Sequence, residues 1–508
     1  MAVLEARVSA APPRVAHFSD RTSAITLGAV GAAVGFAGSW IPSYWGDEAA
    51  SIMSASRSWP SLWSELGTID AVHGTYYAFL HLWTMLFGTS ELATRAPSAI
   101  AVGFMVAGTF VIARRFGTQR FAILAAVVCM VLPRATFLST EARSYAFAAA
   151  AAVWLTELCL ELVRRQAPRS RWVLYGLAMA ASIYLFLYLA LLLVVHAVYI
   201  YLSQRQAIRP WSRGALVAVV AALPIILIAT REKWQIDFLA RRNYATVANI
   251  LVKQWFGTPW VAILCWAFIV IVVVAYLRNR RGWKDRPAAG FASLAFAWLA
   301  LPTAMLLAAN AVSPMYNVRY LSFSTPAAAL LIAVGVSVAA RFVARVVGRR
   351  TQRRAPMTAI AALVVLSLAA LCAPVYIGQR TPFAKDGGSD LRQVSEYFAA
   401  QGRTGDAVVF DQTTKPSRNP RLALRLYPSG FAGLSDIELL APFDSASTLW
   451  DTVAPLPAVA HLPERVWAVE LGHGSSVPPD VAVLKQRGYV VESSTVIHRT
   501  HIYLLEKE

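Results

Sequence analysis

The stretch WVAILCWAFIVIVVVAYL, residues 260–277, is eighteen residues long and contains no charged side chain. A helix needs about 17–25 predominantly apolar residues to cross the hydrocarbon core of a bilayer. A basic cluster follows it directly, made up of Arg278, Arg280, Arg281, Lys284 and Arg286. Because such clusters are enriched on the cytoplasmic side of membranes, the stretch predicts a transmembrane helix whose C-terminal end faces the cytoplasm.

Ten further apolar stretches bring the predicted number of spans to eleven. They are residues 24–41, 98–113, 121–137, 145–163, 172–187, 188–203, 215–230, 289–309, 321–341 and 357–377. The chain of 508 residues is 57% hydrophobic, with a mean hydropathy of +0.51, far above the values typical of soluble domains. A cleavable signal peptide is the alternative for residues 24–41, because Ala37 and Ser39 imitate a small-x-small cleavage site.

The formal net charge of +19 is unevenly distributed. Of the 47 Lys and Arg residues, 34 precede residue 378, together with only 13 of the 28 Asp and Glu residues. Much of this excess lies in alternate loops, a pattern typical of membrane topology rather than of nucleic-acid binding. It predicts a cytoplasmic segment 1–22, a transmembrane domain 23–377 and an extracytoplasmic domain 378–508, all at the cell membrane.

The last of these segments has the pattern of a small soluble α/β domain. The stretches DLRQVSEYFAAQG and DVAVLKQRG predict helices, whereas DAVVFD, RVWAVELG, YVVESS and HIYLLEKE predict strands. Helices that alternate with strands are typical of a layered α/β fold. The predicted fold class is therefore a polytopic α-helical membrane protein with a C-terminal extracytoplasmic α/β domain.

Two adjacent carboxylates, Asp47 and Glu48, begin the first long outer loop in the stretch SYWGDEAASIM, residues 43–53. Outside the membrane there is no ATP or nucleotide sugar, so an activated sugar must arrive on a lipid such as a polyprenyl phosphate. Its phosphate is already a competent leaving group. The reaction then needs a carboxylate that takes the proton of the acceptor hydroxyl and cations that stabilise the released phosphate.

The predicted outer side offers both kinds of group. We predict Asp47 and Glu48 as catalytic residues. The substrate-binding candidates are Asp70, His73, Tyr76, Tyr77, Glu141, Arg143, Arg241, Arg242, Lys253, Arg319 and Tyr320. Asp, Glu and His side chains also bind hard cations, so a divalent cation remains possible and is left unassigned.

Each candidate also has a structural interpretation. The two adjacent carboxylates would serve equally to cap the helix that follows them. Asp70 and His73 are three residues apart, so they would meet on one helical face, either to fix the loop or to bind the acceptor or a cation. Glu141 and Arg143 are explained by an interfacial salt bridge or by contact with the donor.

The remaining candidates are aromatic or basic. Tyr76 and Tyr77 would either anchor the loop at the bilayer interface or stack on a sugar. The alternative for the cations of the loop 231–259 is contact with anionic lipid headgroups. Arg319 stands alone on a short loop directly before a span, which favours contact with the donor.

The motifs WGDEA, DAVHGTYY, LFGTSELATRAPSA, STEARSYAF and NVRYLSFSTPAAALL, in this order, resemble the GT-C superfamily of polytopic glycosyltransferases. The nearest branch contains the protein O-mannosyltransferases and the lipid A aminoarabinose transferases. The resemblance covers about residues 20–345 and implies that Asp47 is the catalytic base of an inverting enzyme. The family often has His-Pro-Pro where this chain has His73, Gly74 and Thr75.

The sequence therefore predicts an inverting glycosyltransferase that uses a polyprenyl-phosphate sugar, with mannose as the first choice and arabinose as the second. The expected acceptor is an extracytoplasmic lipoglycan, wall polysaccharide or protein, and the chain also contacts membrane lipids but no nucleic acid. The alternatives are a lipid or solute transporter and a non-catalytic scaffold in cell-wall assembly.

Overall fold

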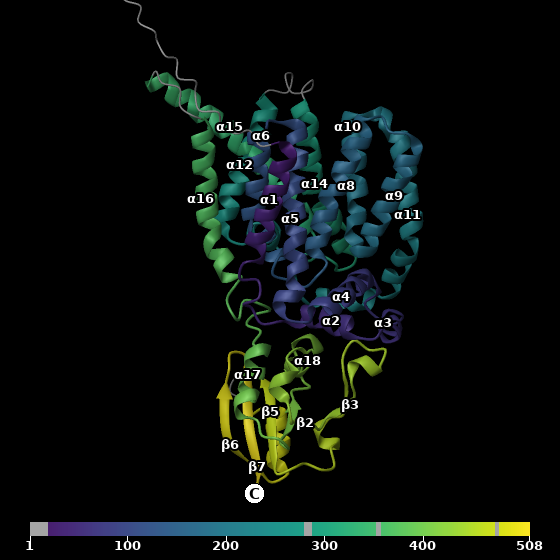
Figure 1. Ribbon diagram of the computed structural model, residues 1–508, viewed down its shortest axis with the longest axis vertical. Helices are drawn as coiled ribbons and strands as arrows, with labels where there is room; N and C mark the ends of the chain where they lie inside the picture. The colour runs from purple at the N-terminus through teal and green to yellow at the C-terminus, as the bar shows by residue number, and fades with distance from the viewer. Residues whose placement is uncertain (1–18, 279–286, 352–356, 473–476) are drawn as a thin grey trace, which may run out of the picture.

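The computed structural model describes residues 19–278, 287–351, 357–472 and 477–508. A bundle of long helices carries a small α/β domain at one end (Figure 1). A helix lies at each of the apolar stretches found in the sequence. These helices are α1 (Asp20–Phe36), α5 (Glu91–Phe116), α6 (Gln119–Val131), α8 (Tyr145–Arg164), α9 (Arg169–Leu185), α10 (Leu191–Ser203), α11 (Ile208–Arg231), α12 (Pro259–Arg278), α14 (Pro287–Val312), α15 (Thr325–Thr351) and α16 (Met357–Gly378).

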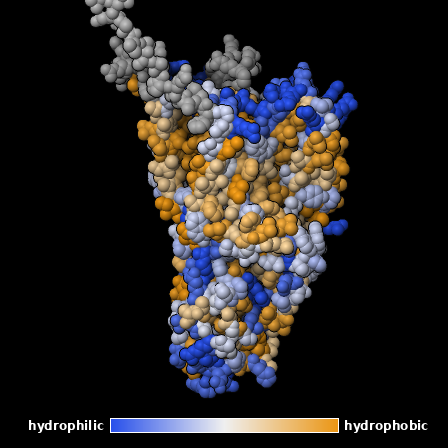
Figure 2. Space-filling model, viewed as in Figure 1, coloured by the Kyte–Doolittle hydropathy of each residue, from blue (hydrophilic) through white to orange (hydrophobic). Residues whose placement is uncertain are grey.

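Seven helices of the described residues are long and apolar enough to cross a membrane, namely α5, α8, α11, α12, α14, α15 and α16. Helices α1, α6, α9 and α10 are shorter and stand in the same bundle (Figure 1). Hydrophobic residues cover the flank of the bundle, whereas hydrophilic ones gather at its far end and on the α/β domain (Figure 2). The chain is a multi-pass membrane protein. The number of eleven spans and the cytoplasmic position of the N-terminus remain predictions. Of the predicted segment 1–22, residues 1–18 lie outside the described residues.

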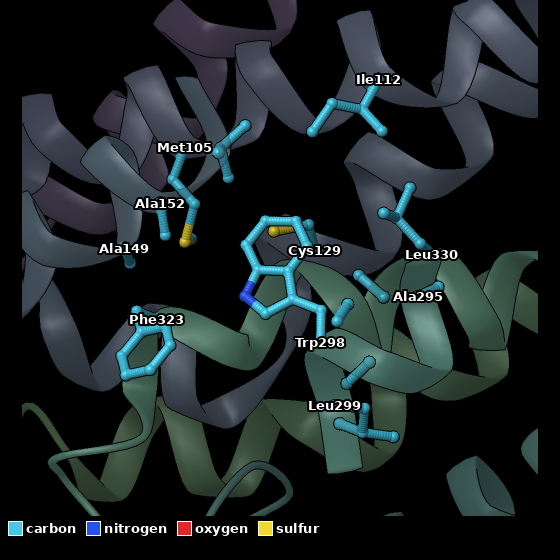
Figure 3. Close-up of a cluster of buried hydrophobic side chains, with 14 of the residues drawn as sticks. Met105, Ile112, Cys129, Ala149, Ala152, Ala295, Trp298, Leu299, Phe323 and Leu330 are labelled. Carbon is cyan, nitrogen blue, oxygen red and sulfur yellow. The ribbon is translucent and has the colours of Figure 1, made fainter. Parts of the chain in front are cut away.

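Glycines set the distance between α1 and α5. A Cβ added at Gly103 would lie 2.6 Å from the carbonyl oxygen of Gly28, and one at Gly28 would lie 3.1 Å from that of Gly103. Small residues let two backbones approach closely, which is how membrane helices gain van der Waals contact. At the centre of the bundle, Trp298 of α14 lies among buried side chains of α5, α6, α8 and α15 (Figure 3).

Short helices cover the end of the bundle that carries the α/β domain (Figure 1). The first long loop contains the short helices α2 (Gly46–Ser56), α3 (Trp59–Leu66) and α4 (Gly74–Phe87). The Ser58 side chain caps α3 by accepting a hydrogen bond from the Ser61 backbone N–H. The other short elements are η1 (Ala71–His73), α7 (Pro133–Leu138), η4 (Lys233–Arg241) and η5 (Asn249–Lys253).

The C-terminal domain contains a five-stranded sheet of order β2-β1-β5-β7-β6. Strand β1 (Ala407–Phe410) pairs in parallel with β2 (Ser435–Asp436) and with β5 (Arg465–Leu471). Strands β6 (Tyr489–Val496) and β7 (Thr500–Lys507) extend the sheet in antiparallel pairing. The helices and the smaller two-stranded sheet are α17 (Leu391–Gln401), α18 (Leu422–Leu426), α19 (Pro479–Gln486), β3 (Leu439–Ala441) and β4 (Thr452–Val453). The α/β pattern predicted for this segment is present.

The C-terminal domain packs directly on α2 and α3. The Arg57 guanidinium donates hydrogen bonds to the carbonyl oxygens of Ala446 and Thr448. At the start of α2 the contact is closer still, because a Cβ added at Gly46 would lie 1.9 Å from the carbonyl oxygen of Ser417. Only glycine fits there, so the backbone of the C-terminal domain fixes the beginning of the helix that carries Asp47.

Candidate active site

Asp47 lies in the first turn of α2, but its side chain does not cap the helix: the N-cap is Trp45, and no side-chain cap bond is formed. Instead, Asp47 Oδ2 accepts a hydrogen bond of 2.6 Å from the guanidinium of Arg319, which lies between α14 and α15. The Asp47 side chain is 28% exposed. Helix capping therefore does not account for this carboxylate.

The electrostatic surroundings keep Asp47 ionised. Burial raises the pKa of its carboxyl, but the charges of Arg319 and Arg143 outweigh this effect and hold the pKa below its usual value. The guanidinium of Arg319 also lies over the ring of Trp45, 4.8 Å from the ring centroid, which fixes its plane. In this state Asp47 is a weak base.

Glu48 points in a different direction and is fully buried. Its carboxylate accepts two hydrogen bonds from Arg95, of 2.7 and 2.6 Å, and one of 2.9 Å from the backbone N–H of Ala142. Arg95 in turn donates to the carbonyl oxygens of Ser39 and Pro42. This network joins α2 to α5 and to the segment before α8, an arrangement that suits a positioning residue better than a group that reacts.

Arg143 lies at the centre of a second network. Its guanidinium donates to the backbone carbonyl of Asp47 at 3.1 Å, to the Tyr77 hydroxyl at 3.4 Å and to His73 Nε2 at 3.1 Å. The Tyr77 hydroxyl donates to Asp70 Oδ2 at 2.8 Å. Asp70 and His73 are thus brought together through Arg143 and Tyr77, and no hydrogen bond or ion pair joins them directly in the described part of the chain.

These contacts determine the charge of both residues. Burial holds the pKa of His73 well below its usual range, and the neighbouring Arg143 acts in the same direction. His73 is therefore neutral and accepts the Arg143 hydrogen bond through Nε2. Burial also raises the pKa of Asp70, although Arg143 and the Tyr77 hydroxyl oppose this. Among the described residues, no group of three or more His, Cys, Asp or Glu side chains is arranged to hold a metal ion.

A cavity of about 360 Å³ lies beside Arg319. Its lining contains four cations and two carboxylates, so the site has an excess of positive charge. The charged residues of the lining are Arg134, Lys253, Arg319, Lys385, Glu141 and Asp386. Trp45, Tyr244 and Asn317 contribute aromatic and polar surface to it. A cavity of this size and charge is suited to a phosphate group and one sugar ring.

The other predicted residues lie elsewhere. Tyr76 is buried against Phe79 and Phe147, which leaves no free ring face for a sugar. Tyr320 stacks on Tyr188 with ring centroids 4.9 Å apart. Arg241 and Arg242 are exposed at the end of η4, and neither lines the cavity.

The salt bridge proposed between Glu141 and Arg143 is not formed in the described structure. Glu141 lines the cavity, where its Oε1 lies 3.6 Å from Lys385 Nζ, whereas Arg143 faces α2 and η1. Three cations of these networks were not predicted from the sequence: Arg95, Arg134 and Lys385. Arg134 directly follows Pro133 near the end of an apolar stretch, and this interruption of the stretch was the only local sign of its role.

No protein-family model matches the sequence, and no curated protein matches it either. Among solved structures, ArnT from Cupriavidus metallidurans bound to undecaprenyl phosphate matches with a TM-score of 0.58 and 14% identity, over 96% of this chain and 98% of that chain. The chain has the fold of ArnT. The apo state of ArnT gives a TM-score of 0.57 at 15% identity with the same coverage. The predicted fold class, GT-C-like with a C-terminal α/β domain, is confirmed.

A more distant likeness is to the oligosaccharyltransferase of Archaeoglobus fulgidus in the apo form. Its TM-score is 0.49 at 9% identity, over 82% of this chain and 65% of that chain.

Proposed function

We propose that this chain is an inverting glycosyltransferase that moves a sugar from a polyprenyl-phosphate donor to an extracytoplasmic acceptor. The observation that carries the proposal is the ion pair between Asp47 and Arg319 at the edge of a cavity with an excess of cations. The pair places a candidate base beside a candidate phosphate site. The fold of ArnT, which in one structure is bound to undecaprenyl phosphate, supports the proposal.

In the proposed reaction, the donor phosphate occupies the cavity against Arg319 and Lys253. Asp47 takes the proton of the acceptor hydroxyl as the hydroxyl oxygen attacks the anomeric carbon from the face opposite the phosphate. The bond between that carbon and the phosphate oxygen breaks, and its electron pair remains on the phosphate. The cations stabilise the charge that develops there, and the sugar is transferred with inversion.

In this scheme Arg319 regulates the basicity of Asp47. In the structure its guanidinium is bound to Asp47 and lowers the pKa of that carboxyl. A phosphate that enters the cavity competes for the same guanidinium and weakens the ion pair. The pKa of Asp47 then rises, so the carboxylate becomes a stronger base only when the donor is present.

The sequence resemblance makes mannose the first choice for the sugar and arabinose the second. The proposed acceptor is a lipoglycan, a wall polysaccharide or a protein hydroxyl. In this scheme Asp70, His73 and Tyr77 orient the acceptor side of the loop through Arg143, and Glu48 positions α2. The protein acts at the cell membrane with its C-terminal domain outside.

A transporter is less consistent with the position of the ionisable groups. Transporters bind their substrates near the middle of the bilayer, between interrupted helices. Here the charged cavity lies at the end of the bundle, next to the C-terminal domain. A non-catalytic scaffold would use Asp47 as a cap, and Asp47 forms no such bond.

The test is sugar transfer by purified protein in lipid vesicles, with synthetic polyprenyl-phosphate mannose as donor and a cell-wall extract as acceptor. Wild type is compared with Asp47→Asn and with Glu396→Gln, which removes an exposed carboxylate on α17. Loss of a general base lowers the rate by about 10²–10⁴-fold, whereas Glu396→Gln should match wild type. Equal transfer by Asp47→Asn would exclude this residue as the base. If wild type also fails with arabinose donors, the transferase proposal is wrong.

A further inference from the structure

One cation of the cavity comes from outside the helix bundle. Lys385 lies in the segment that joins α16 to α17, residues 379–390, here called the link segment. Its side chain is only 3% exposed, and its Nζ lies 2.9 Å from the Thr140 hydroxyl and 4.6 Å from the centroid of the Phe137 ring. The ammonium therefore reaches from the link segment into the lining of the cavity.

The counter-ion of Lys385 is bound loosely. Glu141 is 1% exposed, and neither of its carboxylate oxygens accepts a hydrogen bond from any described residue. The separation of 3.6 Å between Oε1 and Lys385 Nζ is too long for a hydrogen bond. A buried carboxylate without hydrogen bonds is energetically unfavourable, and an ammonium has three donors. On the cavity side, Glu141 can therefore accept further hydrogen bonds and Lys385 can donate them.

The link segment is built to hold this position. Asp386, Gly387 and Gly388 have φ angles of 43°, 69° and 103°, a left-handed run that turns the chain sharply. The Asp386 carboxylate accepts two hydrogen bonds of 2.9 Å from Arg418. The backbone carbonyl of Asp386 accepts another, of 3.0 Å, from Arg499. These contacts attach the residue next to Lys385 to the C-terminal domain.

The other end of the link segment is attached to the bundle. Gln379 donates to the carbonyl oxygen of Pro133, and Arg380 donates to the carbonyl oxygens of Gly35 and Ala37. Lys385 is therefore placed by both halves of the protein. The fixed backbone favours a defined binding geometry over a mobile tether.

We propose that Lys385 binds the phosphate group of the lipid donor and that Glu141 is its counter-ion before the donor binds. This inference rests on the proposed function and adds that the C-terminal domain, through the link segment, completes the donor site. As the phosphate enters, the ammonium donates a hydrogen bond to a phosphate oxygen and exchanges a loose pair for a direct one. Charge-assisted bonds of this kind are among the strong polar contacts in proteins.

The electrostatic surroundings agree with this role. Burial lowers the pKa of Lys385 to about 8. The charged groups that act on it besides burial are Glu141 and Glu48, which raise the pKa, and Arg95 and Arg380, which lower it. A bound phosphate adds negative charge next to the ammonium and holds it protonated.

The test measures binding of undecaprenyl phosphate itself to the full chain in nanodiscs, which requires no sugar and no acceptor. Lys385→Met should weaken binding at least about tenfold, the loss expected for a charge-assisted hydrogen bond. Lys385→Arg keeps the charge and should restore most of the affinity. Lys485→Met, on the exposed face of α19, is the matched control and should bind as wild type does.

Three further ligands and two further variants complete the design. Undecaprenol tests the tail alone, and phosphatidylglycerol and inorganic phosphate test whether any phosphate suffices. Glu141→Gln should bind undecaprenyl phosphate more tightly than wild type, because it removes the competing anion. The double variant Lys385→Met/Glu141→Gln removes both charges of this pair, so it reports on binding even if Lys385→Met folds poorly.

The outcomes separate the two proposals. If wild type binds undecaprenyl phosphate and both Lys385→Met and the double variant bind it equally well, Lys385 is not a donor ligand and the proposed function stands. If wild type binds undecaprenol as tightly as undecaprenyl phosphate, no phosphate is recognised and both proposals are wrong.

Discussion

The substitution Glu48→Gln tests the network that positions α2. The Glu48 carboxylate and the Arg95 guanidinium both have no solvent exposure, and two hydrogen bonds of 2.6–2.7 Å join them. The change leaves the guanidinium buried without its counter-charge. Breaking a buried ion pair in this way costs about 3–5 kcal/mol. We therefore expect a loss of stability of this size.

The same substitution should also lower transfer, because Glu48 and Asp47 are neighbours on α2. A displacement of a catalytic group by about 1 Å is enough to reduce a rate roughly 10²-fold. The assays are the free energy of unfolding from SDS titration and sugar transfer by the folded fraction. Binding of undecaprenyl phosphate should change much less, since Glu48 does not line the cavity.

A second buried pair provides the control. Glu65 lies 2.7 Å from Arg57 in the same loop, and both side chains have no solvent exposure. Burial raises the pKa of Glu65 to about 7, so this carboxyl is partly protonated at neutral pH and Glu65→Gln should cost less stability. It should leave the transfer rate of the folded protein unchanged. If Glu48→Gln costs less than about 1 kcal/mol, as exposed pairs do, the assigned role of this network is wrong.

Three further outcomes are expected. The substitution Arg319→Gln removes one of the two positive charges that lower the pKa of Asp47 and leaves only Arg143 against the effect of burial. The pKa should rise, so the acid limb of the pH profile of residual transfer should move to higher pH; an unmoved limb would contradict the ion pair. Binding of undecaprenyl phosphate should weaken as the pH rises through about 8, where Lys385 loses its charge, and Lys385→Arg should abolish this dependence in titrations from pH 6 to 10. Gly388→Ala should lower stability by about 1–3 kcal/mol and weaken the same binding, because its Cβ would lie 2.3 Å from an imidazole ring; Gly405→Ala, also at positive φ but in open space, should leave binding intact.

The helices of the bundle were predictable because each one is recorded locally, as a run of apolar residues. The C-terminal strands were predictable for a similar reason: short runs such as AVVF in β1 and RVWAVEL in β5 are bounded by turn residues. The first loop was harder, because α4 is as apolar as a span and only its length of 14 residues separates it from one.

Individual residues of the site were also predictable from local patterns, whereas the contacts between them were not. Asp47 and Arg319 were found individually, from two carboxylates beside a span and a lone cation before another. Their ion pair was not predictable, since 272 residues separate them. Lys385 was missed because the link segment has the polar composition of the soluble domain, and its burial arises only when that domain packs on the bundle.

The contact between Gly46 and the carbonyl of Ser417 also has a consequence for biosynthesis. The start of α2 takes its final position only when the backbone around residue 417 is in place. At a translation rate of about 5–20 residues per second, the 370 residues between these positions take roughly 20–75 s to synthesise. During that interval the start of α2, which carries Asp47, lacks the backbone on which it packs. If the proposed function holds, a truncated product released by the ribosome would therefore be inserted in the membrane but inactive.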